Sequence, residues 1–168
     1  RYKQPTVMRR ITRRMQVTQT LTMNDYLELL SKSETEPQAL MQDLLISVTS
    51  FFRDPAAFEA LAKQAIVPIF DQIGSNSPIR AWIAGCATGE EAYTIAMLLL
   101  EEAGRREMRP EIQVFATDLD ETALATAREG RYPASIEAIV SEDRLRMYFI
   151  RDGDRYRVRR EVRDLVVF

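Results

Sequence analysis

The sequence contains no histidine and a single cysteine, Cys86. The absence of histidine excludes Ser–His and Cys–His nucleophile pairs, histidine-ligated zinc and the most common general base. A single cysteine excludes an internal disulfide and a multi-cysteine metal site, so we expect no bound metal. Any chemistry at this protein must therefore proceed without a side chain that takes a proton at neutral pH.

Strong charge bias and long apolar runs are also absent. The 23 basic and 25 acidic residues nearly balance, so bulk electrostatics indicate no partner. No apolar run approaches the length of a membrane span and no signal peptide is visible, so we expect no membrane insertion. The 168 residues, 46% of them hydrophobic, can form a core in one domain or two small ones. Because the chain starts at Arg1 inside a patterned segment, we expect it to be part of a longer protein.

The central pattern is the segment 79–93, IRAWIAGCATGEEAY. Its apolar start predicts a strand buried on both faces, and Gly85 to Gly89 predict a turn. Apolar residues then recur at helical spacing from Ala92 onward, and Gly104 is placed to end that helix. A strand that passes through a glycine turn into a helix is how α/β proteins present backbone N–H groups to a ligand.

Spacing selects among the ligands that such a turn can bind. No Lys-Ser/Thr pair follows Gly89, as a P-loop requires, and the glycines do not match G-x-G-x-x-G. Instead, Glu90 and Glu91 open the helix, which suits a ligand with hydroxyls and positive charge, such as S-adenosylmethionine. The alternative is that both glutamates only complement the helix dipole.

A second buried strand is predicted over 112–117 and ends at Asp118. An acidic residue at this point is where related folds hold ribose hydroxyls, so we assign Asp118 to the ligand. Asp120 is more simply explained as the N-cap of the helix that follows. Farther along, residues 149–158 predict a hairpin with Asp152-Gly153 as its two-residue turn.

The first 46 residues predict a small helical bundle, in which the segment Thr22-Met23-Asn24-Asp25 resembles the capping box that starts a helix. In the first helix Arg9, Arg10, Arg13 and Arg14 lie on one side and form a positive strip. This strip is either a solvated face or a surface that docks an acidic partner. Nucleic acid is not supported, because no aromatic platform or second basic cluster accompanies the strip. Asp54-Pro55 predicts the start of a helix, which Pro68 kinks or ends.

Four segments in order carry a resemblance to a known family: MRRITRRM, VTSFFRDPAAF, RAWIAGCATGEEAYTIAM and FATDLDETALATAREGRY. The chain resembles the bacterial chemotaxis-receptor glutamate methyltransferases (CheR type), especially members in hybrid methylesterase–methyltransferase sensor proteins. The resemblance implies an α/β fold: an N-terminal all-α subdomain and a truncated Rossmann-like methyltransferase domain with a small β-hairpin subdomain. The implied boundaries are 1–54 for the helical domain and linker, 55–168 for the cofactor domain and about 132–168 for the β-subdomain.

The resemblance also implies a cytoplasmic enzyme of signal transduction that uses S-adenosyl-L-methionine, leaves S-adenosyl-L-homocysteine and methylates receptor glutamates. Its partner is the cytoplasmic helical bundle of methyl-accepting chemotaxis receptors, which the arginine strip would approach. Arg53 would contact the methionine carboxylate and border the reaction centre, and Glu91 would lie near the methionyl ammonium. The implied cofactor-binding residues are Ser47, Thr49, Arg53, Gly85, Glu91 and Asp118.

The family pattern continues beyond Val166-Val167-Phe168 with further strands and helices. We therefore expect an incomplete cofactor pocket, weak cofactor binding, poor methylation and self-association through an open sheet edge. The reduced hairpin loop argues against binding of a receptor tail there. Two alternatives to the enzyme remain: a non-catalytic cofactor-sensing or scaffolding module of the same fold, and a nucleic-acid methyltransferase with salt-sensitive binding.

Overall fold

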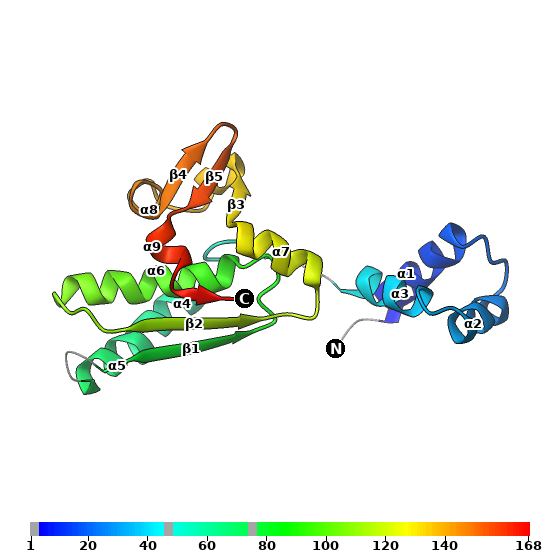
Figure 1. Ribbon diagram of the computed structural model, residues 1–168, viewed down its shortest axis with the longest axis horizontal. Helices are drawn as coiled ribbons and strands as arrows, with labels where there is room; N and C mark the ends of the chain where they lie inside the picture. The colour runs from blue at the N-terminus through cyan, green and yellow to red at the C-terminus, as the bar shows by residue number, and fades with distance from the viewer. Residues whose placement is uncertain (1–3, 46–48, 74–76) are drawn as a thin grey trace. The chain divides into compact units, whose positions relative to one another are not determined.

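The computed structural model describes residues 4–45, 49–73 and 77–168. Contacts group the chain into two compact units, Arg1–Ile46 and Ser47–Phe168. The described part of the first unit is helical and the second contains a parallel sheet with helices (Figure 1), which confirms the α/β class. Residues 47–54, which sequence analysis assigned to the first domain and its linker, group with the second unit.

The described residues of the first unit form three helices: α1 Gln4–Val17, α2 Met23–Lys32 and α3 Glu36–Leu44. Helix α2 begins at the predicted box. The Thr22 side chain accepts from the Asp25 N–H and the Asp25 carboxylate accepts from the Thr22 N–H. These two bonds satisfy backbone donors that the helix itself leaves unpaired.

A buried polar cluster joins the three helices of this unit. The Glu36 carboxylate accepts two hydrogen bonds from Arg14, at 2.9 and 2.6 Å, and one from the Tyr26 hydroxyl at 2.8 Å. Glu36 is only 7% exposed. The bond from Arg14 lowers the pKa of Glu36, and burial raises the pKa of Tyr26 to about 12. The cluster therefore depends on an ionised Glu36.

Replacement of Glu36 by glutamine is expected to destabilise the first unit by about 3 kcal/mol, because it leaves the half-buried Arg14 charge without its partner. Since the folded-state pKa of Glu36 lies below its unfolded value of about 4.3, this stabilisation is present above that pH and is lost as pH falls through the folded value. Denaturant unfolding at pH 7 and at acid pH measures both effects. Glu28→Gln is the matched control, because Glu28 pairs with Lys32 on the surface. This variant should change the free energy of unfolding by less than about 0.5 kcal/mol. Equal effects of the two variants would contradict the stabilising role of Glu36.

The second unit opens with a helix that continues past Pro68. Asp54 caps helix α4 (Pro55–Leu61), as predicted, by accepting from the Ala57 N–H. A π-helical segment, η1 (Ala62–Ile66), then leads into α5 (Val67–Gln72). Pro68 lies in the first turn of α5, directly after this segment, and its ring and missing N–H do not fit a regular α-helical turn. The widened turn is thus the irregularity that lets the helix pass a proline.

The main sheet has three parallel strands in the order β1-β2-β6. They are β1 (Ile79–Ala84), β2 (Ile112–Thr117) and β6 (Val166–Val167). Helix α6 (Glu90–Arg105) follows β1 and packs against β2 and β6, and α7 (Glu121–Glu129) follows β2. The carboxyl ends of β1 and β2 meet at one edge of the sheet, where parallel α/β folds bind ligands.

The expectation that the first strand is buried on both faces is wrong. Ile79 and Ile83 are buried, but Trp82 is 72% exposed. Its neighbours in register on the other strands, Phe115 and Val167, are exposed as well. One face of the described sheet therefore joins the core and the other presents apolar side chains. The prediction for the helix end also differs, because α6 runs through Gly104 to Arg105.

A second, antiparallel sheet lies apart from the main one, with strand order β3-β5-β4 (Figure 1). Strands β4 (Phe149–Asp152) and β5 (Arg155–Val158) form the predicted hairpin, and β3 (Arg131–Pro133) pairs with β5. The turn is Gly153-Asp154 and not Asp152-Gly153, because Asp152 pairs with Arg155 and Gly153 takes the positive φ of 65°. The β-subdomain expected to reach residue 168 ends with β5, since β6 belongs to the main sheet.

Three short helices complete the second unit: η2 Ala134–Ala138, α8 Glu142–Tyr148 and α9 Arg160–Arg163. Ser141 caps α8 by accepting from the Arg144 N–H. No helix in the described ranges is both long enough and apolar enough to span a bilayer. The same residues contain no group of three or more carboxylates or thiols arranged to hold a metal ion.

Candidate functional site

The turn after β1 takes the left-handed backbone conformation at three residues, two glycines and Ala87, whose φ is +47°. Gly85 and Gly89 have φ values of +77° and +91°. A Cβ on Gly89 would lie 2.8 Å from the Ala127 Cβ and 3.0 Å from the Phe168 Cζ, whereas a Cβ on Gly85 would meet nothing within 4 Å. Gly89 is therefore required both for its φ and for the close approach of α6 to α7. Gly85 leaves open space above the end of β1.

Asp118 fixes the shape of this turn. One carboxylate oxygen accepts from the Ala87 N–H at 2.7 Å and the other from the Asp120 N–H at 2.8 Å. Each oxygen keeps further acceptor capacity, because a carboxylate offers about four lone-pair sites. The Asp120 side chain accepts from the Ala123 N–H at the start of α7, which confirms its interpretation as an N-cap.

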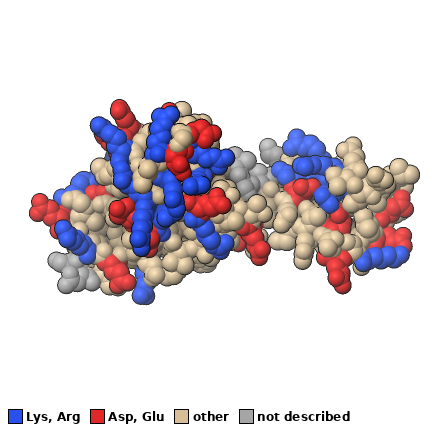
Figure 2. Space-filling view, turned by 45° about the horizontal axis from the view of Figure 1, so that its top comes forward, with Lys and Arg blue, Asp and Glu red and all other residues tan. Residues whose placement is uncertain are grey.

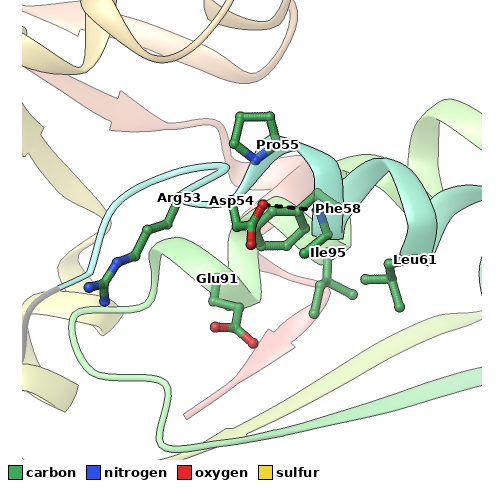
Figure 3. A pocket seen from close by; sticks show the side chains of 8 residues that line it. Arg53, Asp54, Pro55, Phe58, Leu61, Glu91 and Ile95 are labelled. Atoms are coloured by element: carbon green, nitrogen blue, oxygen red, sulfur yellow. Dashed lines mark hydrogen bonds between the residues drawn. The ribbon is translucent and has the colours of Figure 1, made fainter.

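A cavity of about 660 Å³ lies beside the turn (Figure 3). Arg53 lines it from the loop before α4 and Glu91 from the first turn of α6, so side chains of opposite charge border the cavity. Phe58, Leu61 and Ile95 supply an apolar wall. The remaining lining residues are Asp54, Pro55 and Ala57.

The two adjacent glutamates at the start of α6 have different surroundings. Glu90 is half-buried and accepts a hydrogen bond from the Thr88 hydroxyl at 2.6 Å. Burial raises the pKa of Glu90, against the effect of that bond. Glu91 is exposed and lines the cavity. Glu91 is therefore the member of the pair that a ligand can meet, while Glu90 stabilises the turn.

The buried thiol of Cys86 lies in the field of both candidate carboxylates. Burial and, after it, the negative charges of Asp118 and Glu91 raise the pKa of Cys86 to about 11. The thiol is thus protonated at neutral pH and is a poor nucleophile.

The β-subdomain supports the loop that carries Arg53. Phe51 packs edge-on against Tyr132 and Phe149, with ring centroids 4.8 and 5.3 Å apart. Tyr132 in turn donates its hydroxyl to the carbonyl of Thr88 in the glycine turn, at 2.7 Å. One buried aromatic cluster therefore holds both the loop and the turn that border the cavity.

Phe52, next to Arg53, is held in a strained conformation. Its φ is +48°, a region that bulky residues rarely adopt. The Arg144 guanidinium lies over the Phe52 ring, 4.1 Å from its centroid, and donates two hydrogen bonds to Glu101 at 2.7 and 2.9 Å. This clamp of α8 onto α6 fixes Phe52 and, through the chain, the position of Arg53.

The structure brings together only part of the predicted site. Arg53 and Glu91 line the cavity, while Gly85 and Asp118 form the adjoining turn. Thr49 is half-buried and does not line the cavity, and Ser47 lies outside the described residues. The roles assigned to these residues stay predictions.

The four arginines of the strip on α1 lie in two different environments. Arg14 binds Glu36, and Arg10 donates to the carbonyl of Asp43, so both belong to the bundle's own structure. Arg9 and Arg13 are exposed. The expectation that all four arginines form one outward strip is therefore corrected to a pair one helical turn apart.

Several residues at the site were missed from the sequence. Phe58, Leu61 and Ile95 have the helical spacing of core residues, and that spacing cannot distinguish a core position from the wall of a cavity. Tyr132 and Arg144 contact the site from elements far away in the chain, and no local pattern marks them.

Both units match descriptions of one protein family. Residues 1–45 match "CheR methyltransferase, all-alpha domain" and residues 47–168 match "CheR methyltransferase, SAM binding domain". Similarity to individual proteins covers nearly the same span. The chain is 44% identical, over 99% of its length, to an uncharacterized 104.1 kDa protein of Rhodobacter capsulatus.

Two named relatives are more distant. The chain is 31% identical over 96% of its length to chemotaxis protein methyltransferase 2 of Pseudomonas aeruginosa. It is 28% identical over 99% of its length to the chemotaxis protein methyltransferase of Listeria monocytogenes. The chain spans 18% of the Rhodobacter protein, 57% of the Pseudomonas protein and 62% of the Listeria protein.

Proposed function

Because the chain belongs to the CheR methyltransferase family, we propose that the protein carrying it transfers a methyl group from S-adenosyl-L-methionine to glutamate side chains of chemotaxis receptors. The product is a glutamate methyl ester. The observation that supports this most is the cavity shared by Arg53 and Glu91 beside the glycine turn that Asp118 holds.

The cofactor of the second unit, a SAM-binding domain, is S-adenosyl-L-methionine, and the residues of the cavity fit it. The volume of about 660 Å³ is within the range of small-molecule sites. Glu91 would pair with the methionyl ammonium, Arg53 with the carboxylate, and the spare lone pairs of Asp118 with ribose hydroxyls. The wall of Phe58, Leu61 and Ile95 supplies apolar contact.

When bound, the cofactor supplies an electrophilic methyl group. An acceptor glutamate has an unperturbed pKa of about 4.3, so it is already an anion at pH 7 and no side chain of this protein needs to remove a proton. This agrees with a sequence that lacks histidine. The chain's own residues can act by alignment, for which effective molarities of about 10⁵ M or more are attainable.

Arg53 would orient the reacting groups at the rim of the cavity. Its guanidinium has a planar fork that fits a carboxylate, and the loop that carries it is held by Phe51 and by the Arg144–Phe52 contact. Tight pairing of Arg53 with the acceptor would stabilise the ground state more than the transition state, in which the carboxylate charge fades. Positioning is therefore the role we assign to it.

The proposed partner is the cytoplasmic helical bundle of a chemotaxis receptor, with Arg9 and Arg13 as the exposed cations that face its acidic surface. We place this reaction in the cytoplasm, where receptor signalling domains lie. Self-association through an open edge stays a prediction; among the described residues, β1 and β6 each pair on one side only.

The test is incubation of the chain, and of a longer protein that contains it, with methyl-labelled S-adenosyl-L-methionine and receptor cytoplasmic domains. Base-labile label released as methanol is the expected result, because a carboxyl ester hydrolyses under these conditions. Cofactor binding without transfer to any receptor fragment would favour the cofactor-sensing or scaffolding alternative.

Replacement of Arg144 by methionine is expected to weaken cofactor affinity about five- to tenfold. The substitution keeps an apolar stem over Phe52 but removes the fork bound to Glu101, so the loop before Arg53 loses one anchor. Stability should fall by about 2 kcal/mol, because Glu101 loses its charged partner. Isothermal titration with S-adenosyl-L-homocysteine and denaturant unfolding measure the two effects.

Arg146→Met is the matched control on the same helix. Arg146 pairs with Asp143 on the surface, and both side chains are largely exposed, so neither affinity nor stability should change appreciably. If R144M and R146M bind the cofactor equally well, the positioning role of Arg144 is wrong.

A further inference from the structure

A second hollow in this unit is lined by arginines. Its volume is about 430 Å³, and four of its five lining residues are Arg128, Arg131, Arg157 and Arg163, the fifth being Glu129. The arginines come from four elements: the end of α7, β3, β5 and α9. Figure 2 shows basic side chains gathered over the face that carries the β-subdomain. We call this feature the arginine pocket.

The protein itself balances only part of this positive charge, through Glu129 in the lining and through one ion pair. Arg131 pairs with Asp152 at 3.0 Å, and Arg128 donates to the carbonyl of Phe168 at 3.2 Å. Within residues 4–45, 49–73 and 77–168, no ion pair involves Arg157 or Arg163. The Nε of Arg163 is buried and lacks a hydrogen-bond partner in the described structure. An anion in the pocket would supply the missing acceptors.

The arrangement also carries an electrostatic cost. Arg131 and Arg157 are direct cross-strand partners in the antiparallel sheet, and like charges in this position are destabilising. A fold that only needed a stable sheet could place any polar residue at either position. The paired arginines are explained if a ligand with at least two negative charges lies between them.

The lining defines the chemistry of that ligand. Guanidinium forks match phosphate oxygens in pairs, and no aromatic or apolar side chain lines the pocket to bind a base or a hydrophobic anchor. Arg157 lies on β5, the central strand of its sheet, so an extended peptide finds no free strand edge beside it. A compact anion fits better than a polypeptide segment.

We propose that the arginine pocket binds a compact phosphate-bearing anion with two or more phosphate groups. This site is separate from the cofactor cavity, with which it shares no lining residue. Gly130, next to Arg131 of the pocket, packs close to both Arg163 and Tyr93 of α6, because a Cβ placed on it would lie 3.1 Å from the Arg163 Cδ and 3.2 Å from the Tyr93 hydroxyl. Tyr93 follows Glu91 by two residues.

The test is isothermal titration of the 168-residue chain with inorganic pyrophosphate and, in separate arms, with inorganic phosphate and adenosine diphosphate. Pyrophosphate is expected to bind saturably and at least tenfold more tightly than phosphate, with affinity that falls as salt rises. Similar affinities of pyrophosphate and adenosine diphosphate would indicate that only the phosphates are recognised. Tighter binding of adenosine diphosphate than of pyrophosphate would indicate that the phosphate groups in the pocket belong to a nucleotide.

The double variant R157Q/R163Q is expected to weaken pyrophosphate binding at least tenfold. Since neither arginine has an ion-pair partner in the described structure, the variant leaves no carboxylate unpaired and should fold, which circular dichroism checks. R155Q is the control, because Arg155 lies on the same strand, is exposed and does not line the pocket. Equal affinities of the two variants, or no saturable binding by the parent chain, would overturn the proposal. So would a hexaglutamate peptide that binds more tightly than pyrophosphate, since the pocket would then be a docking site for an acidic segment.

Discussion

Replacement of Arg53 by alanine is expected to slow methyl transfer to a receptor fragment about 100-fold or more. Arg53 lines the cavity together with Glu91, and a misplacement of reacting groups by about 1 Å can cost a factor of this size. A 100-fold loss corresponds to about 2.7 kcal/mol in the barrier. Because Arg53 is exposed, the variant should retain its unfolding midpoint.

The measurement is initial rate against cofactor and receptor concentration, with incorporated methyl label as the readout. Arg53→Lys tests the role of the planar guanidinium, since lysine keeps the charge but not the planar geometry. The rate of methyl transfer by R53K is expected to exceed that of R53A by less than tenfold. Arg80→Ala, an exposed position on β1, is the control and should leave the rate unchanged. An R53A variant as fast as R80A would remove Arg53 from the proposed site.

Replacement of Gly89 by alanine is expected to destabilise the second unit by about 3 kcal/mol and to weaken cofactor binding more than tenfold. The new Cβ would lie 2.8 Å from the Ala127 Cβ at a φ of +91°. Overpacking and backbone strain each cost about 1–3 kcal/mol. Relief of the clash must move α6 away from α7 and with it the first turn that carries Glu91.

Gly85→Ala is the informative comparison. The φ of +77° at Gly85 also strains alanine, but the new Cβ meets nothing within 4 Å. The free energy of unfolding is therefore expected to fall by only about 1 kcal/mol. The space above Gly85 is where we place the ligand, so cofactor affinity should fall more than stability does. Denaturant unfolding and isothermal titration of both variants separate the two effects. Equal stability losses in G85A and G89A would contradict the packing role of Gly89.

Local patterns predicted much of the fold because they depend on short-range physics. The capping box at Thr22, the Asp54 cap before Pro55 and the Asp120 cap of α7 all occur as expected. The glycine turn between β1 and α6 also forms where its spacing indicated. Each of these depends on residues within a few positions of one another.

Features that depend on distant partners were not predicted. Strand β3 spans only three residues and forms because β5 offers it a partner. A strand with alternating burial and a strand buried on both faces can have the same apolar residues, so Trp82 did not reveal the exposed face. Arg14 looked like a surface cation because helical spacing does not show that Glu36 and Tyr26 approach it from other helices.

For the site, the sequence indicated which charged residues take part but not their surroundings. The glycine turn, the Glu90-Glu91 pair and Asp118 could be predicted from motif spacing, and Arg53 from the family resemblance. The difference between Glu90 and Glu91 could not, since it depends on which carboxylate Thr88 and burial engage. The Arg144 clamp and the arginine pocket come from residues far apart in the chain that only folding brings together.

The most direct test of the central claim is a crystal structure of the chain with bound S-adenosyl-L-homocysteine. We predict the ligand beside the turn after β1, with its ammonium within hydrogen-bond distance of Glu91, its carboxylate near Arg53 and its ribose hydroxyls on Asp118. A ligand bound elsewhere on the unit, with none of these three side chains in contact, would contradict the account.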